Sequence, residues 1–474
     1  MIAQVLNRDF VLDQMDLVCA ELERGTPEER RSTSLPFDHR QPVYTAAASQ
    51  LRDAQRREML SSSGQPGYED ATSERRNDPV ASLDDHAFVS RDPLVCLLQT
   101  ALEEFFETQR SDLISEAPPF DDDRRGPDDD VVVTDVALAN CPPTRSPDGD
   151  RRVFGAFSET DPKWLASWMA EGIRLFNGKH AFQDAPATPF TIADKCRVIC
   201  IGDWGSGLPR AQKVASEIRK VLDDGKQKGL QQHVIHLGDV YYSGWRREYE
   251  NRFLASWPVR LDESREITSW SLNGNHDMYS GGHAYFDFLL ADPRFAHQEG
   301  SSYFSISNAN WDILGLDTAY EDAALYGPQR DWVRRILGQS KKKSMLLSHH
   351  QLFSAYEGGS ALLGEALRDI LGGPKAIDVW FWGHEHRCVF YRPHQNVRNA
   401  RLIGHGGVPV YMLHRNEAPY PEPAYYEYRE YLSKSLGLEH FALFGFAVLE
   451  FDGPVLRVRY IDENGRQHAE ETIQ

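Results

Sequence analysis

One pattern in the second half of the chain constrains its fold more than any other feature. After residue 190, short apolar runs end repeatedly in glycine and polar residues. The runs are RVICIGDWG (197–205), HVIHLGDVYYSG (233–244), ITSWSLNGNHD (267–277), SMLLSHHQ (344–351) and DVWFWGHEH (378–386). A helix is predicted over 209–229, because Pro209 suits its first turn. This pattern predicts an α/β fold with polar residues at the carboxyl ends of strands, where such sheets bind ligands.

Two further regions complete the predicted organisation. Residues 441–465 read as two antiparallel strands that are joined at Asp452-Gly453. Before residue 191, helical spacing follows Asp92-Pro93 and Asp161-Pro162, whereas residues 61–79 and 117–130 are too polar and too rich in turn formers to build a core. We therefore expect an acidic, mostly helical N-terminal region with disordered linkers over 1–190, and a catalytic domain over 191–474.

The charge of the chain lies mainly in that N-terminal region. The net charge is −19, and residues 1–190, with 20 basic and 35 acidic side chains, contribute 20 − 35 = −15 of it. An acidic face repels nucleic acid, so no nucleic-acid partner is expected. No apolar run approaches the ~18 residues of a membrane span. The N-terminus lacks the pattern of a secretory signal, and the six scattered cysteines suggest no disulfide framework, so we expect a cytoplasmic location.

The strand ends carry residues that suit a metal site. They are Asp203, Asp239, Asn275, His276, Asp277, His349, His384 and His386. Each alone is weak evidence, since an aspartate after a strand is commonly a turn residue and a single histidine is commonly structural. Together they offer carboxylate, amide and imidazole ligands, which divalent and trivalent first-row metals accept. A glycine directly precedes several of these residues, and its missing Cβ lets the backbone turn sharply beside an ion.

The ordered motifs GDWG, GDVYY, GNHD, LLSHH and GHEH resemble those of the calcineurin-like metallophosphoesterases, over roughly residues 194–465. The resemblance implies a four-layer αββα β-sandwich, two metal ions and the cleavage of phosphate esters. In that superfamily the first motif usually ends in a histidine ligand, and Gly205 stands there instead. The purple acid phosphatase branch is similar in this respect and places a tyrosine three residues after the second aspartate. Tyr242 has that position, and Tyr241 is expected only to pack.

The resemblance also implies a role for each residue. Asp203, Tyr242 and His386 hold Fe(III), Asn275, His349 and His384 hold a divalent ion (Fe, Zn or Mn), and Asp239 bridges both. His276 faces the substrate and protonates the leaving oxygen, while Asp277 orients its ring. His350 occupies a variable position next to the ligand His349.

The expected function is therefore hydrolysis of a small phosphorylated substrate, most simply a phosphomonoester, through attack by metal-bound hydroxide. One alternative is a phosphodiesterase that acts on a cyclic nucleotide or another diester with two divalent metals. Another is a protein that binds a partner through its N-terminal helices and retains only vestigial hydrolysis. The sequence names neither that partner nor the physiological substrate.

Overall fold

The computed structural model describes residues 178–474, apart from 356–357, 409–422 and 427–442. Before residue 178 it describes only short stretches and single positions, so the helix predicted after Asp92-Pro93 lies outside the described residues. The chain divides into two compact units, and the one that carries the predicted motifs contains Gly178–Gln474. The boundary predicted at 190/191 stays a prediction. No helix within the described residues is long and apolar enough to cross a membrane.

The strands of this unit form two sheets. The larger sheet has the order β1-β5-β6-β7-β8-β10-β9-β11, and the smaller has the order β14-β13-β12-β2-β3-β4. The larger contains β1 (Phe190–Thr191), β5 (Phe304–Ser307), β6 (Trp311–Leu316), β7 (Lys343–Ser348), β8 (Ile377–Trp382), β9 (Cys388–Tyr391), β10 (Val397–Ile403) and β11 (Pro423–Tyr426). The smaller contains β2 (Lys195–Ile201), β3 (Gln231–His236), β4 (Ile267–Ser271), β12 (Gly445–Asp452), β13 (Val455–Asp462) and β14 (Gln467–Ile473).

Helices connect and cover these strands. The α-helices are α7 (Pro209–Gln227), α8 (Arg246–Glu248), α9 (Asn275–Tyr279), α10 (Gln329–Gln339), α11 (Ala361–Ala366) and α12 (Arg368–Leu371). Short π-helical and 3₁₀ segments span Tyr249–Leu254, Leu261–Glu263, Tyr285–Leu289 and Pro293–Gln298. The predicted helix over 209–229 is confirmed as α7, and the predicted C-terminal strand pair is confirmed as β12 and β13, which are antiparallel.

Alternation along the strands explains why the two sheets stack. In β2, Val198 and Cys200 face a core shared with the larger sheet, whereas Ile199 and Ile201 face α7. In β8, Val379 and Phe381 enter the shared core, while Trp380 and Trp382 face the other way. Successive side chains of a strand point to opposite faces, so each of these strands is buried on both sides.

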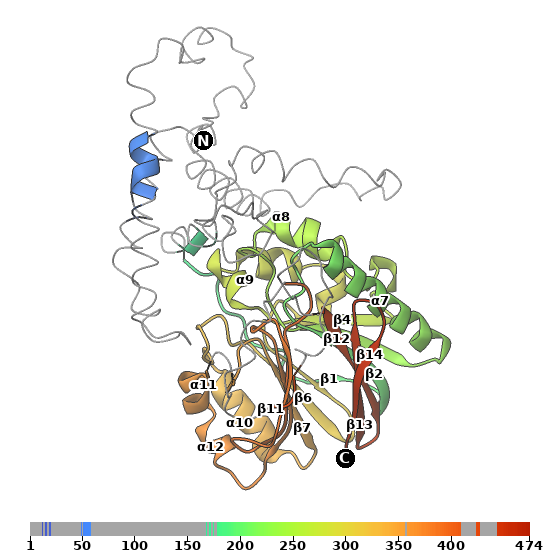
Figure 1. Cartoon of the computed structure of the whole chain (residues 1–474). Coiled ribbons are helices and arrows are strands. Elements are labelled where there is room, and N and C mark those ends of the chain that lie inside the picture. The colour runs from blue at the N-terminus through green and yellow to red at the C-terminus, as the bar shows by residue number, and fades with distance from the viewer. Residues whose placement is uncertain are drawn as a thin grey trace. The chain divides into compact units, whose positions relative to one another are not determined.

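Helices close both outer faces of the stacked sheets (Figure 1). Val214, Ile218 and Leu222 of α7 pack on the smaller sheet, and Trp332 and Val333 of α10 belong to the core on the outer face of the larger sheet. The order helix, sheet, sheet, helix confirms the predicted four-layer fold. Because β2, β3 and β4 run parallel to one another, as do β6, β7 and β8, their carboxyl ends gather at common sheet edges.

Candidate metal centre

Five strand ends deliver the predicted residues to one place. Asp203 and Asp239 follow β2 and β3, His349 directly follows β7, and His384 and His386 follow β8. Asn275 opens the short helix α9 after β4. Parallel strands therefore explain how residues up to 183 positions apart in the chain, Asp203 and His386, come within 3.5 Å of one another.

The backbone at these residues is unusual. Asp203, Asp239, His384 and His386 have φ values of 55°, 74°, 73° and 48°. Residues other than glycine seldom adopt this left-handed region, and such strain concentrates at functional sites. Glycine is needed nearby for a different reason, since a Cβ at Gly274 would lie 2.0 Å from Asp239 Oδ1.

The first cluster surrounds the hydroxyl of Tyr241. This hydroxyl donates to Asp203 Oδ1 or Asp239 Oδ2, each 3.0 Å away, and lies 2.7 Å from His386 Nε2. The ligand atoms of Asp203, Asp239 and His386 lie close enough together to share one cation. Both aspartates are buried, whereas His386 is partly open to solvent.

The second cluster is a triangle of one amide and two imidazoles. Asn275 Oδ1 lies 2.9 Å from His349 Nε2 and 3.1 Å from His384 Nδ1, and these two nitrogens are 3.3 Å apart. His349 Nε2 is also 3.4 Å from Asp239 Oδ2, the same oxygen that reaches Tyr241. Asp239 therefore lies between the two clusters, at the place of a bridging ligand.

The structure differs from the sequence-based interpretation at the two tyrosines. Tyr241 was expected only to pack, and this was wrong, because its hydroxyl lies among Asp203, Asp239 and His386. The ring of Tyr242 instead lies under the guanidinium of Arg252, 5.6 Å from its carbon. In the sequence, only motif spacing distinguishes the two adjacent tyrosines, and the assignment of Tyr242 as a ligand stays a prediction.

A buried carboxylate holds this tyrosine loop, and sequence reasoning missed it. Glu248 accepts hydrogen bonds from the backbone N–H groups of Tyr242, Ser243 and Trp245. Arg252 pairs with Glu248 at 3.0 Å and also donates to the carbonyl of Tyr241. The spacing of Glu248 and Arg252, four residues apart, is a helical ion-pair signal that could have pointed to them.

His276 lies beside the clusters, as expected, but the contact expected between its ring and Asp277 is not found among the described residues. The Nδ1 of His276 lies 2.6 Å from the carbonyl of Tyr242, and its Nε2 lies 4.0 Å from Asp239 Oδ2. A backbone carbonyl, and not Asp277, is thus the partner of His276 Nδ1. His276 Nε2 faces the clusters, as a residue near the substrate should.

Asp277 instead organises the backbone around Asp239. Its carboxylate accepts from the N–H groups of Asp239 (2.8 Å), Val240 (3.1 Å) and Gly274 (2.6 Å), and from the hydroxyl of Tyr249. Burial first, and then the charge of Asp239, raise the pKa of Asp277 to about 7. Asp277 therefore holds the backbone at Asp239, Val240 and Gly274 in place.

Asp277→Ala should lower the free energy of unfolding by about 3 kcal/mol or more, since each buried donor left unsatisfied costs ~1–3 kcal/mol. Urea denaturation measures this change. Asp287→Ala is the control, because Asp287 pairs with His180 near the surface and such pairs contribute only ~0–1 kcal/mol. Equal losses in the two variants would contradict the role given to Asp277.

Comparison with known proteins identifies the domain. Residues 196–388 match the calcineurin-like phosphoesterase family. This chain carries a calcineurin-like phosphoesterase domain. No curated protein matches the chain.

The structure is similar to several solved structures at low sequence identity. GAP50, the anchor in the inner membrane complex of Plasmodium, is 12% identical, covers 59% of this chain and 89% of its own, and has a TM-score of 0.43. A dimetal phosphatase from Danio rerio is 14% identical, with 59% and 98% covered and a TM-score of 0.37. Vps29 from Chaetomium thermophilum is 14% identical, with 59% and 95% covered and a TM-score of 0.26. The family match, not these scores, supports a metal-dependent phosphoester hydrolase.

The donor set of the phosphoesterase domain fits two metal ions. Within the described residues, no lysine or arginine pairs with Asp239, although burying a carboxylate without a cation is costly. Burial lowers the pKa of His386 to about 3, and lowers that of His349 well below its ordinary value. Both rings are therefore neutral at pH 7, which is the form that binds metal.

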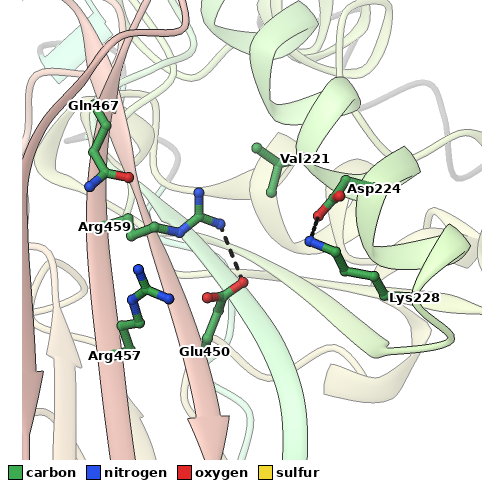
Figure 2. Close-up of a pocket in the computed structure, with 7 residues that line it drawn as sticks. All are labelled: Val221, Asp224, Lys228, Glu450, Arg457, Arg459 and Gln467. Carbon is green, nitrogen blue, oxygen red and sulfur yellow. Dashed lines mark hydrogen bonds and ion pairs between the residues drawn. The ribbon is translucent and has the colours of Figure 1, made fainter.

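A pocket elsewhere in the unit that contains Gly178–Gln474 has a different character from the candidate metal centre. It lies between the end of α7 and strands β12 to β14 (Figure 2), and it is lined by Val221, Asp224, Lys228, Glu450, Arg457, Arg459 and Gln467. Asp224 pairs with Lys228 at 2.8 Å, and Glu450 pairs with Arg459 at 3.3 Å. Glu450 lies opposite Arg197 near the start of β2, at the other end of that strand from Asp203. This pocket of ion pairs is therefore separate from the candidate metal centre.

Proposed function

We propose that the protein hydrolyses phosphomonoesters at a binuclear centre of the purple acid phosphatase type, which pairs Fe(III) with a divalent iron, zinc or manganese ion. The observation that carries this proposal is the phenol of Tyr241 within 3.0 Å of both Asp203 and Asp239. A phenolate is a hard anionic ligand and suits a trivalent iron, whereas a centre with two divalent ions has no special need of one.

Each of the two clusters would bind one of the two ions. Asp203, Tyr241 and His386 would hold iron, Asn275, His349 and His384 would hold the divalent ion, and Asp239 would touch both. Burial, and next the charges of Asp203 and Asp239, raise the pKa of Tyr241 well above its ordinary value. The phenol is therefore protonated until a cation takes the place of its proton.

The side chains around the ions have separate tasks in this proposal. When bound, the two ions supply positive charge to the phosphoryl oxygens and to the attacking water. His276 holds a proton at Nε2 for the leaving oxygen, and the carbonyl of Tyr242 fixes its ring through Nδ1. Asn275 is held through its Nδ2, which donates to the hydroxyl of Tyr279 over 2.8 Å, so that its Oδ1 points toward the imidazoles.

A substrate panel tests the proposed preference. We expect the protein loaded with iron and zinc to have a higher kcat/KM for small phosphomonoesters than for cyclic nucleotides and other diesters. A higher kcat/KM for diesters, with full activity when only divalent ions are supplied, would favour the alternative of a phosphodiesterase.

The iron–phenolate contact predicts a colour. The iron-loaded protein should be violet, because charge moves from phenolate to Fe(III) on absorption of visible light. Tyr241→Phe should bleach this band, and Tyr242→Phe, which removes the hydroxyl of the adjacent tyrosine, is the matched control. If the visible band disappears only in Tyr242→Phe, then Tyr242 is the iron ligand, as motif spacing predicts. If neither variant changes the visible spectrum, no tyrosine binds the iron.

A further inference from the structure

A third imidazole lies beside the divalent cluster, and neither the motif nor the proposed function uses it. His350 is buried, with 4% of its surface exposed. Its ring centroid lies 4.7 Å from that of His384 and 4.9 Å from that of His349. One ring nitrogen from each of the three histidines lies within 4.8 Å of the other two. Two nitrogens that bind one zinc ion at ~2.1 Å in tetrahedral geometry are ~3.4 Å apart, so any two of these nitrogens would have to approach by at most about 1.4 Å.

Thr318 fixes the orientation of His350. The Oγ1 of Thr318 lies 3.0 Å from the backbone nitrogen of His350 and 3.2 Å from its Nδ1. His349 is held in the same manner, since its Nδ1 lies 3.0 Å from the carbonyl of Leu237. A metal-binding histidine commonly has one ring nitrogen anchored by an oxygen, which leaves the other nitrogen for the ion. In both residues the remaining atom is Nε2.

We propose that His350 Nε2 is a third imidazole ligand of the divalent ion, beside His349 and His384. This inference rests on the metal-binding part of the proposed function, and it adds a ligand to that site. Imidazole suits zinc and iron, whereas magnesium and manganese favour oxygen ligands. The third imidazole therefore biases the site toward zinc or ferrous iron and against magnesium.

One neighbouring group offers a competing role for His350. Asp322 Oδ1 lies 3.4 Å from His350 Nε2, and its side chain is 40% exposed. If Nε2 served only to hold Asp322, removing the carboxylate would disturb the site as much as removing the imidazole. Asp322→Asn keeps the shape of the side chain and is therefore the matched control.

Zinc K-edge absorption spectroscopy tests the inference without any substrate. In the full chain loaded with iron and zinc, we expect three imidazoles around zinc, and one fewer in His350→Ala. The zinc Kd, measured with a competing chelator, should rise by ~100-fold or more in His350→Ala, since even groups that only position a ligand contribute ~10–100-fold. Asp322→Asn should keep three imidazoles around zinc and change the zinc Kd by less than ~3-fold, well below the effect of losing a ligand.

The outcomes separate this inference from the proposed function. Two imidazoles in the wild-type protein, or an unchanged Kd in His350→Ala, would overturn it even if phosphomonoesters were hydrolysed. Three imidazoles would support it even if no phosphoester were hydrolysed. The wild-type count needs no variant, so it decides the question even if His350→Ala does not fold.

Discussion

Asp239→Ala should abolish phosphoester hydrolysis and remove both metal ions from the protein together. Asp239 Oδ2 lies 3.0 Å from the Tyr241 hydroxyl and 3.4 Å from His349 Nε2, so one oxygen serves both clusters. Bound metal ions contribute several kcal/mol to such reactions, so we expect turnover to fall by ~10³-fold or more. Metal analysis of the purified variant, together with kcat on a phosphomonoester, measures both effects.

Asp312→Ala is the matched control for Asp239→Ala. Asp312 is also a buried carboxylate, but it lies at the start of β6 and bonds to Ser307 and Ser340. The start of this parallel strand is the end remote from the metal ligands, so the control should keep its metal and its turnover. Loss of one ion only in Asp239→Ala would contradict a bridging role, and retention of both would remove Asp239 from the centre.

His276→Ala should keep both metal ions but reduce kcat by ~10²–10⁴-fold, the usual contribution of a general acid or base. The His276 ring lies beside the candidate ligands, with its Nε2 4.0 Å from Asp239 Oδ2, and is not itself assigned as a ligand. Loss of the ring therefore removes a proton donor without removing a ligand. Wild-type kcat in a variant with full metal content would exclude His276 from proton transfer.

The dependence of kcat on pH is a second test of the role of His276. Burial lowers the pKa of His276 below its ordinary value, and the charge of Asp239 opposes this shift only in part. The protonated ring that can donate is therefore populated at acidic pH, and kcat should fall as the pH rises through that pKa. His276→Ala should lose this limb of the profile.

The fold and the approximate site were predictable because they depend on local patterns. Apolar runs such as HVIHL, each followed by glycine and a polar residue, predict strands that end at a common edge. Because the carboxyl ends of parallel strands lie at one edge of a sheet, the polar residues at those ends come close together. The structure brings Asp203, Asp239, Asn275, His349, His384 and His386 together.

Other features depend on three-dimensional detail that the sequence does not encode locally. The choice between Tyr241 and Tyr242 depends on how one loop turns, and Glu248 and Arg252 hold that loop. The role of Asp277 depends on three N–H groups that converge on it, from Asp239, Val240 and Gly274. The strands β5, β6, β9 and β10 were not predicted, because no polar motif marks their ends.

Metal content and activity, measured on one sample, test the central claim most directly. Freshly purified protein should hold two ions per chain, one of them iron, and should hydrolyse a phosphomonoester. A chelator that removes both ions should abolish this hydrolysis, and restoring iron with zinc should recover it. Hydrolysis that persists after complete removal of the ions, or a protein that never binds more than traces of metal, would contradict the account.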